Sequence, residues 1–147
     1  GNHPGTTLLH DYPGVLMLAP GDVPPPGPSR VVMAPYNLLD HTFAREQFST
    51  WRREKRGIVA INVLLGGALR QGSRDPRVRP FECLAKPGRT LVQAAIQFVI
   101  ANEGVSAALV RCSTIAHLEE VLQAPEAPPL TTQELEQTFE LYANRYE

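Results

Sequence analysis

Cysteine, net charge and long hydrophobic runs are all scarce in this sequence, and each scarcity excludes a class of protein. Its two cysteines, Cys83 and Cys112, lie in separate predicted elements without metal-ligand spacing, which indicates reduced thiols and a cytoplasmic compartment. Fourteen basic residues oppose 15 acidic ones, so no overall field would attract nucleic acid or an anionic membrane. No apolar run reaches the roughly 18 residues of a membrane helix, and residues 1–13 lack the core of a signal peptide. We therefore expect a cytoplasmic protein with neither nucleic acid nor membrane as a partner.

The short motifs that carry common catalytic chemistry are missing as well. The sequence contains no P-loop spacing, no paired carboxylates and no nucleophile placed beside a base. His41 and His117 are isolated from each other and from any acidic pair, so no metal site is predicted. There is also no internal repeat. Function must therefore be inferred from the fold and from the loops at the ends of its strands.

Short apolar runs alternate with amphipathic segments along most of the chain. Strands are predicted over residues 14–19, 30–34, 58–64 and 105–110. Helices are predicted over residues 43–55, over 91–102 with Thr90 as the cap, after Ser113 or Thr114 as the cap, and after a capping-box pattern at residues 131–134. Such alternation is typical of parallel strands joined by right-handed crossovers. The sequence therefore predicts an α/β fold, either a small doubly wound sheet or part of a (β/α) barrel.

The apolar periodicity of each segment also predicts which side chains are buried. The segment 58–64 is apolar on both faces, as in a parallel sheet that helices cover on both sides. The helix after residues 113–114 should bury Ile115, Leu118, Val121 and Leu122, and the last helix should bury Leu135, Thr138, Phe139 and Tyr142. Residues 70–89 carry six basic side chains and three prolines, which indicates a long surface loop with a short helical turn near residues 80–85.

A glycine pair, Gly66–Gly67, closes the apolar run that begins at Gly57. The carboxyl ends of strands in α/β proteins are where ligands bind. A glycine pair there lets a ligand approach the backbone, but glycine serves tight turns everywhere. Similarly, Tyr36 and Asn37 could serve a ligand or simply close their strand. The residues alone leave these alternatives open.

Five segments, in order and at matching spacings, resemble the second half of the aldo/keto reductase family. Residues 32–39, Val-Met-Ala-Pro-Tyr-Asn-Leu-Leu, resemble its sixth barrel strand, and residues 56–69 resemble the seventh strand with its glycine loop. Residues 90–102 resemble the next helix, and residues 107–120 resemble the eighth strand with the helix that follows it. Residues 130–135 resemble the opening of the last helix. The resemblance implies half of a (β/α)8 barrel of the TIM type over residues 31–147. Residues 1–30 then form a proline-rich segment with one strand.

The resemblance also implies a cofactor, because that family reduces aldehydes and ketones with NADPH held largely by this half of its barrel. The implied contacts are Gly66 and Gly67 near the pyrophosphate, Ser113 and Thr114 at a helix amino end, Arg111 at the 2′-phosphate and Glu120 at the adenine. Arg111 could equally be a solvent-facing charge at a strand end.

Three positions depart from the family's pattern. Met33 replaces the Gln that holds the nicotinamide amide, Ile61 replaces the aromatic residue that stacks on the nicotinamide, and Val121 replaces an Asn beside the adenine-contacting acid. No stretch matches the half of the barrel that supplies the family's proton-donating Tyr. Since carbonyl reduction requires a proton donor near the carbonyl oxygen, we assign no catalytic residue.

Four parallel strands would leave two open edges and an apolar inner face. We therefore expect a partner, either a second copy of the chain or a complementary protein chain, unless the proline-rich segment covers one edge. We favour a truncated aldo/keto-reductase-like domain without independent catalysis, acting through assembly or residual dinucleotide binding. The alternative is an NADPH-dependent aldehyde or ketone oxidoreductase that is active as an oligomer or with a complementary chain.

Overall fold

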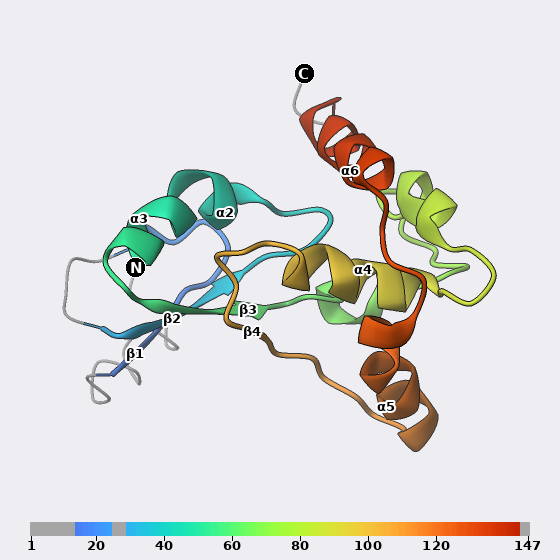
Figure 1. Cartoon of the computed structure of the whole chain (residues 1–147), viewed down its shortest axis with the longest axis horizontal. Coiled ribbons are helices and arrows are strands. Elements are labelled where there is room, and N and C mark those ends of the chain that lie inside the picture. Colours follow the sequence, from blue (N-terminus) through green and yellow to red (C-terminus); the bar gives the residue numbers. More distant parts are fainter. Residues whose placement is uncertain (1–13, 25–28, 145–147) are drawn as a thin grey trace.

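A parallel four-stranded sheet organises the computed structural model, which describes residues 14–24 and 29–144. The strands are β1 (Val15–Met17), β2 (Val31–Pro35), β3 (Gly57–Ile61) and β4 (Ala107–Ala108). They lie in the order β1-β2-β3-β4, and each strand pairs in parallel with the next one along the chain (Figure 1). The predicted α/β fold with parallel strands is therefore confirmed. Residues 1–13 and 25–28 of the proline-rich segment lie outside the described residues.

The two faces of the sheet differ in burial. Val32, Ala34, Ile58 and Ala60 are fully buried on the face that packs against the helices. The alternate residues on β1, β2, β3 and β4, which form the row Met17, Met33, Val59 and Ala107, are half-buried or exposed. The prediction that the third strand is buried on both faces is wrong, because only one face of β3 is buried. We call the face with the half-buried row the inner face.

Two short helices, α2 (Thr42–Glu46) and α3 (Phe48–Arg53), replace the single helix predicted over residues 43–55. The break lies at Gln47, whose φ of −126° is not helical. On one continuous helix, residues five apart lie about 140° apart around the axis, so Phe43 and Phe48 could not both face the sheet. The break allows Phe43, Phe48 and Trp51 all to be buried.

Helix α4 (Leu91–Ile100) begins at the predicted cap and is the most buried helix of the described chain. The Thr90 hydroxyl accepts a hydrogen bond from the Gln93 amide at 3.2 Å, and the Gln93 side-chain oxygen accepts one from the Thr90 amide at 3.0 Å. This reciprocal capping box satisfies two amides that would otherwise lack partners. The Gln97 side chain donates to the carbonyls of Ala124 and Ala127, which ties α4 to the segment that follows α5.

The segment between β3 and α4 is largely the basic surface loop that its composition indicates, because Arg70, Arg74, Arg77, Arg79 and Lys86 are all exposed. Its helical turn, η2 (Arg79–Leu84), lies close to where a turn was predicted, but Phe81 and Leu84 within it are fully buried. Arg89 is also buried, at 2% exposure. Its guanidinium donates to the carbonyls of Leu84 and Pro128 and to the Glu134 carboxylate at 2.6 Å. A fully paired guanidinium can be buried, so this one joins the loop to the last helix.

The last two helices bury fewer side chains than predicted. Helix α5 (Ile115–Leu122) has no buried residue, so the predicted burial of its apolar positions is wrong. Helix α6 (Thr132–Asn144) begins with the predicted capping box, in which Thr131 and Glu134 exchange two hydrogen bonds of 3.1 Å. Thr138 and Tyr142 of α6 are buried as predicted, whereas Phe139 is exposed.

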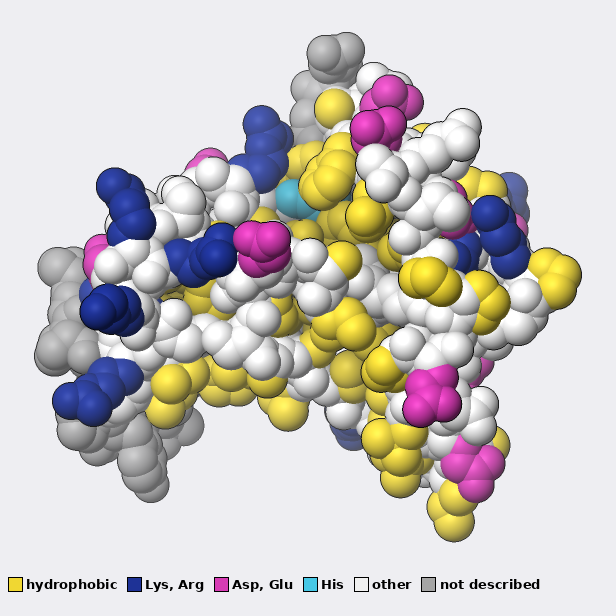
Figure 2. All heavy atoms as spheres, viewed as in Figure 1, with side chains coloured by type: hydrophobic (Ala, Val, Ile, Leu, Met, Phe, Trp, Pro, Cys, Tyr) yellow, Lys and Arg dark blue, Asp and Glu magenta, His cyan; other side chains and the backbone are white. Residues whose placement is uncertain are grey.

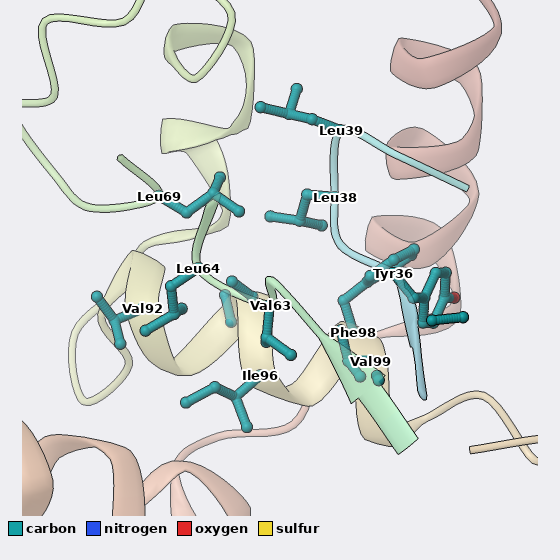
Figure 3. Close-up of a cluster of buried hydrophobic side chains, with 14 of the residues drawn as sticks. Tyr36, Leu38, Leu39, Val63, Leu64, Leu69, Val92, Ile96, Phe98 and Val99 are labelled. Carbon is teal, nitrogen blue, oxygen red and sulfur yellow. The ribbon is translucent and has the colours of Figure 1, made fainter. Parts of the chain in front are cut away.

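The core extends beyond the strands to the segments that follow their carboxyl ends. Figure 3 shows Leu38, which follows β2, close to Leu69, and Leu64, which follows β3, beside Val92 of α4. All four side chains are buried. The turns at the carboxyl ends of the strands are therefore anchored by buried side chains, and this packing fixes the position of the glycine pair.

Candidate functional site

A pocket of about 770 Å³ lies at the carboxyl ends of β3 and β4. One wall comes from the end of β3 and the turn after it, and the other from the extended segment between β4 and α5. The residues that line it are Ile61, Asn62, Val63, Leu64, Gly66, Gly67, Leu109, Val110, Arg111, Ser113 and His117. This is the edge of a parallel α/β sheet at which ligands bind.

The turn after β3 has an unusual backbone. Asn62 and Leu65 have φ values of 56° and 52°, and Gly66 and Gly67 follow with 63° and 89°. The strand ends at Ile61 rather than at Leu64 as predicted, because Asn62 leaves the extended conformation there. Residues 65–67 form the 3-10 turn η1 (Leu65–Gly67). Positive φ values suit glycine and, among other residues, asparagine, so the sequence matches the geometry at Asn62, Gly66 and Gly67, whereas Leu65 adopts a strained conformation.

The two glycines leave open space beside the backbone. A Cβ atom placed on Gly66 or on Gly67 would have no atom within 4 Å. The Gly67 amide already donates to the Leu64 carbonyl at 3.0 Å within the turn. A ligand can therefore approach the backbone closely here, and the Gly67 amide is used to hold the turn.

Asn37 holds the end of β3 in place from the neighbouring strand. Its side-chain amide donates to the Asn62 carbonyl at 3.1 Å, and its side-chain oxygen accepts from the Leu39 amide at 2.8 Å. Asn37 is fully buried, so it closes its strand rather than facing a ligand. Tyr36 is also buried, which raises the pKa of its phenol against the opposing effect of the hydrogen bond from Asn102.

The opposite wall leads into the amino end of α5. The Thr114 hydroxyl accepts a hydrogen bond from the His117 amide at 3.0 Å, so Thr114 caps the helix as predicted. Arg111 and Ser113 lie in the extended segment before this cap and line the pocket. The free amides and the dipole at a helix amino end favour an anion. Arg111 adds a full positive charge on the same wall.

The structure brings four of the six residues implied as cofactor contacts into one pocket, namely Gly66, Gly67, Arg111 and Ser113. Thr114 and Glu120 are not among the lining residues. Thr114 is occupied as the helix cap, and the Glu120 carbonyl accepts a hydrogen bond from the Gln93 side chain at 3.0 Å. The role of Glu120 toward a ligand stays a prediction.

His117 lines the pocket although sequence reasoning considered it only as an isolated metal ligand. Its position three residues after the cap Thr114 was the available signal, because that position lies in the first turn of the helix. Arg111 and His117 are the ionisable residues among those that line the pocket in the described chain, and no carboxylate lines it. The described residues contain no group of three or more potential metal ligands. The chemistry of the pocket is therefore that of an anion site with apolar walls.

Comparisons with known proteins agree with this architecture. A family model described as the aldo/keto reductase family matches residues 27–143. The aldo-keto reductase AKR11C1 from Bacillus halodurans, in its holo form, is 22% identical with a TM-score of 0.66, over 78% of this chain and 42% of that one. The thermostable aldo-keto reductase Tm1743, in complex with the inhibitor epalrestat, is 24% identical with a TM-score of 0.64, over 78% and 40%.

The chain spans about two fifths of the length of these solved proteins. At such identities the likeness concerns the fold, which resembles part of their barrel. The search of curated proteins gave no match. Within the described residues, no helix has both the length and the apolar character to cross a membrane.

Proposed function

The chain belongs to the aldo/keto reductase family, and on that basis we propose that its pocket binds the phosphate-bearing part of NADP(H). One observation carries this proposal. Gly66, Gly67, Arg111 and Ser113 are far apart in the sequence, each corresponds to a cofactor position of the family, and all four line the same pocket.

Each wall of the pocket supplies a different part of the proposed site. On the α5 side, the Arg111 guanidinium would pair with the 2′-phosphate, and the Ser113 hydroxyl and the helix amino end would contact the phosphates. On the β3 side, Gly66 and Gly67 would let the pyrophosphate lie against the backbone. His117 lines the same pocket and would offer an imidazole N–H group to the phosphates.

Two residues depart from the family's pattern at the nicotinamide end of the proposed site. Ile61 lines the pocket but offers an alkyl group instead of the ring that stacks in the family. Met33 offers no amide group, and it pairs in register with Val59 rather than with Ile61. When bound, the cofactor would supply a hydride. The residues that line the pocket include no tyrosine or lysine, and the one histidine, His117, lies on the α5 side, where the phosphates would bind. We therefore propose binding without independent catalysis for this stretch of chain.

Calorimetric titration of the purified chain with NADPH and with NADH tests the proposal. A charge-assisted hydrogen bond contributes about 1.5–3 kcal/mol, so Arg111→Ala should weaken NADPH binding roughly 10-fold to 100-fold. NADH lacks the 2′-phosphate, so the wild-type chain should prefer NADPH and the Arg111→Ala variant should lose that preference.

Arg53→Ala is the matched control, because Arg53 ends α3 near the amino end of β3. The pocket lies at the carboxyl ends of the strands, on the opposite side of the sheet's length. This variant should bind NADPH as the wild type does. Absence of binding at millimolar NADPH would overturn the proposal. An equal loss in the Arg53 and Arg111 variants would also overturn it, because binding would then reflect general charge.

A further inference from the structure

Among the described residues, both outer strands of the sheet have an open edge without charged side chains or proline. β1 and β4 are the terminal strands, and each pairs with one neighbour among the described strands. Natural edge strands are commonly protected by a short length, which β1 and β4 have at three and two residues, and by charged side chains or proline. The stretches 14–19 around β1 and 105–110 around β4 contain neither a charged side chain nor a proline. Both edges are therefore chemically suited to pair with a further strand.

Helix α5 presents an apolar stripe at the β4 edge. Ile115, Leu118 and Leu122 lie on one side of the helix and are 77%, 44% and 66% exposed. Leu109, which follows β4, is also exposed. Figure 2 shows hydrophobic side chains along the lower margin of the molecule, reaching the lower right, where Figure 1 places α5. An exposed stripe that continues an open sheet edge marks an interaction surface.

The layer of helices that covers the outer face of the sheet differs between the β1 edge and the β4 edge. The β2–β3 connection supplies α2 and α3, the β3–β4 connection supplies α4, and α5 follows β4. The β1–β2 connection contributes no helix in its described residues, 18–24 and 29–30. At the β4 edge, α5 therefore has no strand beneath its apolar stripe, and at the opposite edge β1 is followed by no helix in the described residues of its connection.

We propose that a second copy of this chain occupies this surface, with β4 of each copy pairing in parallel with β1 of the other. A half-turn about an axis along the strands keeps all eight strands parallel and closes both open edges at once. Eight strands form a barrel whose interior side chains can fill. The inner row Met17, Met33, Val59 and Ala107 carries no charge, so two inner faces can meet without burying an unpaired ion. The α5 stripe of each copy would then cover the β1 end of the other.

The lengths of the solved relatives agree with an occupant of this size. The matched part makes up 42% of the Bacillus halodurans chain, so the other 58% of that protein lies outside the match. A second copy would supply a comparable amount of polypeptide here. The proposal does not depend on dinucleotide binding.

Light scattering coupled to size exclusion, at chain concentrations from about 1 to 100 μM, tests the dimer directly. One chain has a mass of 16.2 kDa, so the dimer should have twice that mass. Leu122→Lys should shift the mass to that of one chain. Leu122 is exposed and ends α5, where a lysine also suits the helix dipole, so the change should leave the fold intact in circular dichroism.

Ile100→Lys is the matched control, because Ile100 ends α4 and is 44% exposed. This variant should remain a dimer. Met33→Lys places a charge on the inner face and should also give single chains. A single-chain mass for the wild type up to 100 μM would overturn the proposal, as would open higher assemblies. A dimer that persists in both Leu122→Lys and Met33→Lys would show that other surfaces form it.

Discussion

His41 makes the stability of this fold sensitive to pH. The side chain is 2% exposed, and its ring stacks on Tyr142 with a centroid distance of 3.9 Å. The ring also stacks on Phe98 at 5.0 Å, and its Nε2 atom has no hydrogen-bond partner within the described structure. Burial lowers the pKa of His41 to about 4, although the Leu38 carbonyl and the Asp40 carboxylate favour the protonated form. The imidazole therefore stays neutral in the folded chain at pH values where the unfolded chain takes up a proton.

The direction of the effect follows from proton uptake. Between pH 6.5 and pH 4 the unfolded state binds more protons than the folded state, so the free energy of unfolding falls as the pH falls. Above pH 6.5 the contribution of neutral His41 is fully present. The difference between the ordinary pKa of 6.5 and about 4 corresponds to about 3 kcal/mol, of which most is lost by pH 4.5. Such a loss is a large fraction of the roughly 5–15 kcal/mol that stabilises a typical domain.

The perturbation that tests this reasoning is His41→Phe, which keeps an aromatic ring and removes the titrating group. Urea unfolding at pH 7.5 and pH 4.5 should show the wild type losing about 2–3 kcal/mol and the variant losing much less. His117→Phe should retain the wild-type loss, because His117 lies at the pocket and outside this aromatic cluster. Equal losses in the wild type and in His41→Phe would refute the role of His41.

Two further substitutions test the glycine turn and the buried ion pair. Gly66→Ala should lower the free energy of unfolding by about 1–2 kcal/mol, because Gly66 has a positive φ of 63°, and it should weaken NADPH binding. Gly72→Ala, at a φ of 71° with equally open surroundings, should show the same stability loss in urea with unchanged NADPH affinity. If both glycine variants changed the NADPH affinity equally, the turn at Gly66 would not be part of the binding site. Arg89→Met should cost at most about 3–5 kcal/mol in the same assay, because Glu134 would lose its buried partner and keep only the half-exposed Lys86 at 3.2 Å. Arg52→Ala, which breaks an exposed pair with Glu103, should cost less than about 1 kcal/mol, and similar losses in both would contradict the structural role of Arg89.

The element order and the helix caps could be predicted from local sequence. The Thr90 and Thr131 caps depend on residues three positions apart, so their hydrogen bonds are encoded within one turn. Parallel pairing followed from the alternation of strands and helices. These features need no knowledge of distant parts of the chain.

Burial was predicted poorly wherever it depends on distant contacts. The break at Gln47 arises because two phenylalanines must reach one sheet, which a single helical period does not reveal. The burial of Arg89 depends on Glu134, which lies 45 residues away. For α5, burial of the apolar stripe was predicted wrongly, because the described chain supplies nothing that covers Ile115, Leu118 and Leu122.

The candidate site was predicted through family resemblance rather than through periodicity. The glycine pair, Arg111 and Ser113 carry no signal of mutual proximity in the sequence, and the parallel sheet places them in one pocket. His117 was missed as a pocket residue because helix-start geometry, rather than any motif, directs it there. Asn37 was considered for a ligand from the sequence, but its buried amide holds the turn and is unavailable to a ligand.

The most direct test of dinucleotide binding locates the ligand on the chain. Amide resonances of the 15N-labelled protein should be followed by NMR while NADPH is added. The shifts should concentrate at Gly66, Gly67 and residues 111–117, and they should be smaller with NADH at the same concentration. Shifts that occur elsewhere, or none at saturating NADPH, would contradict the assignment of this pocket as the cofactor site.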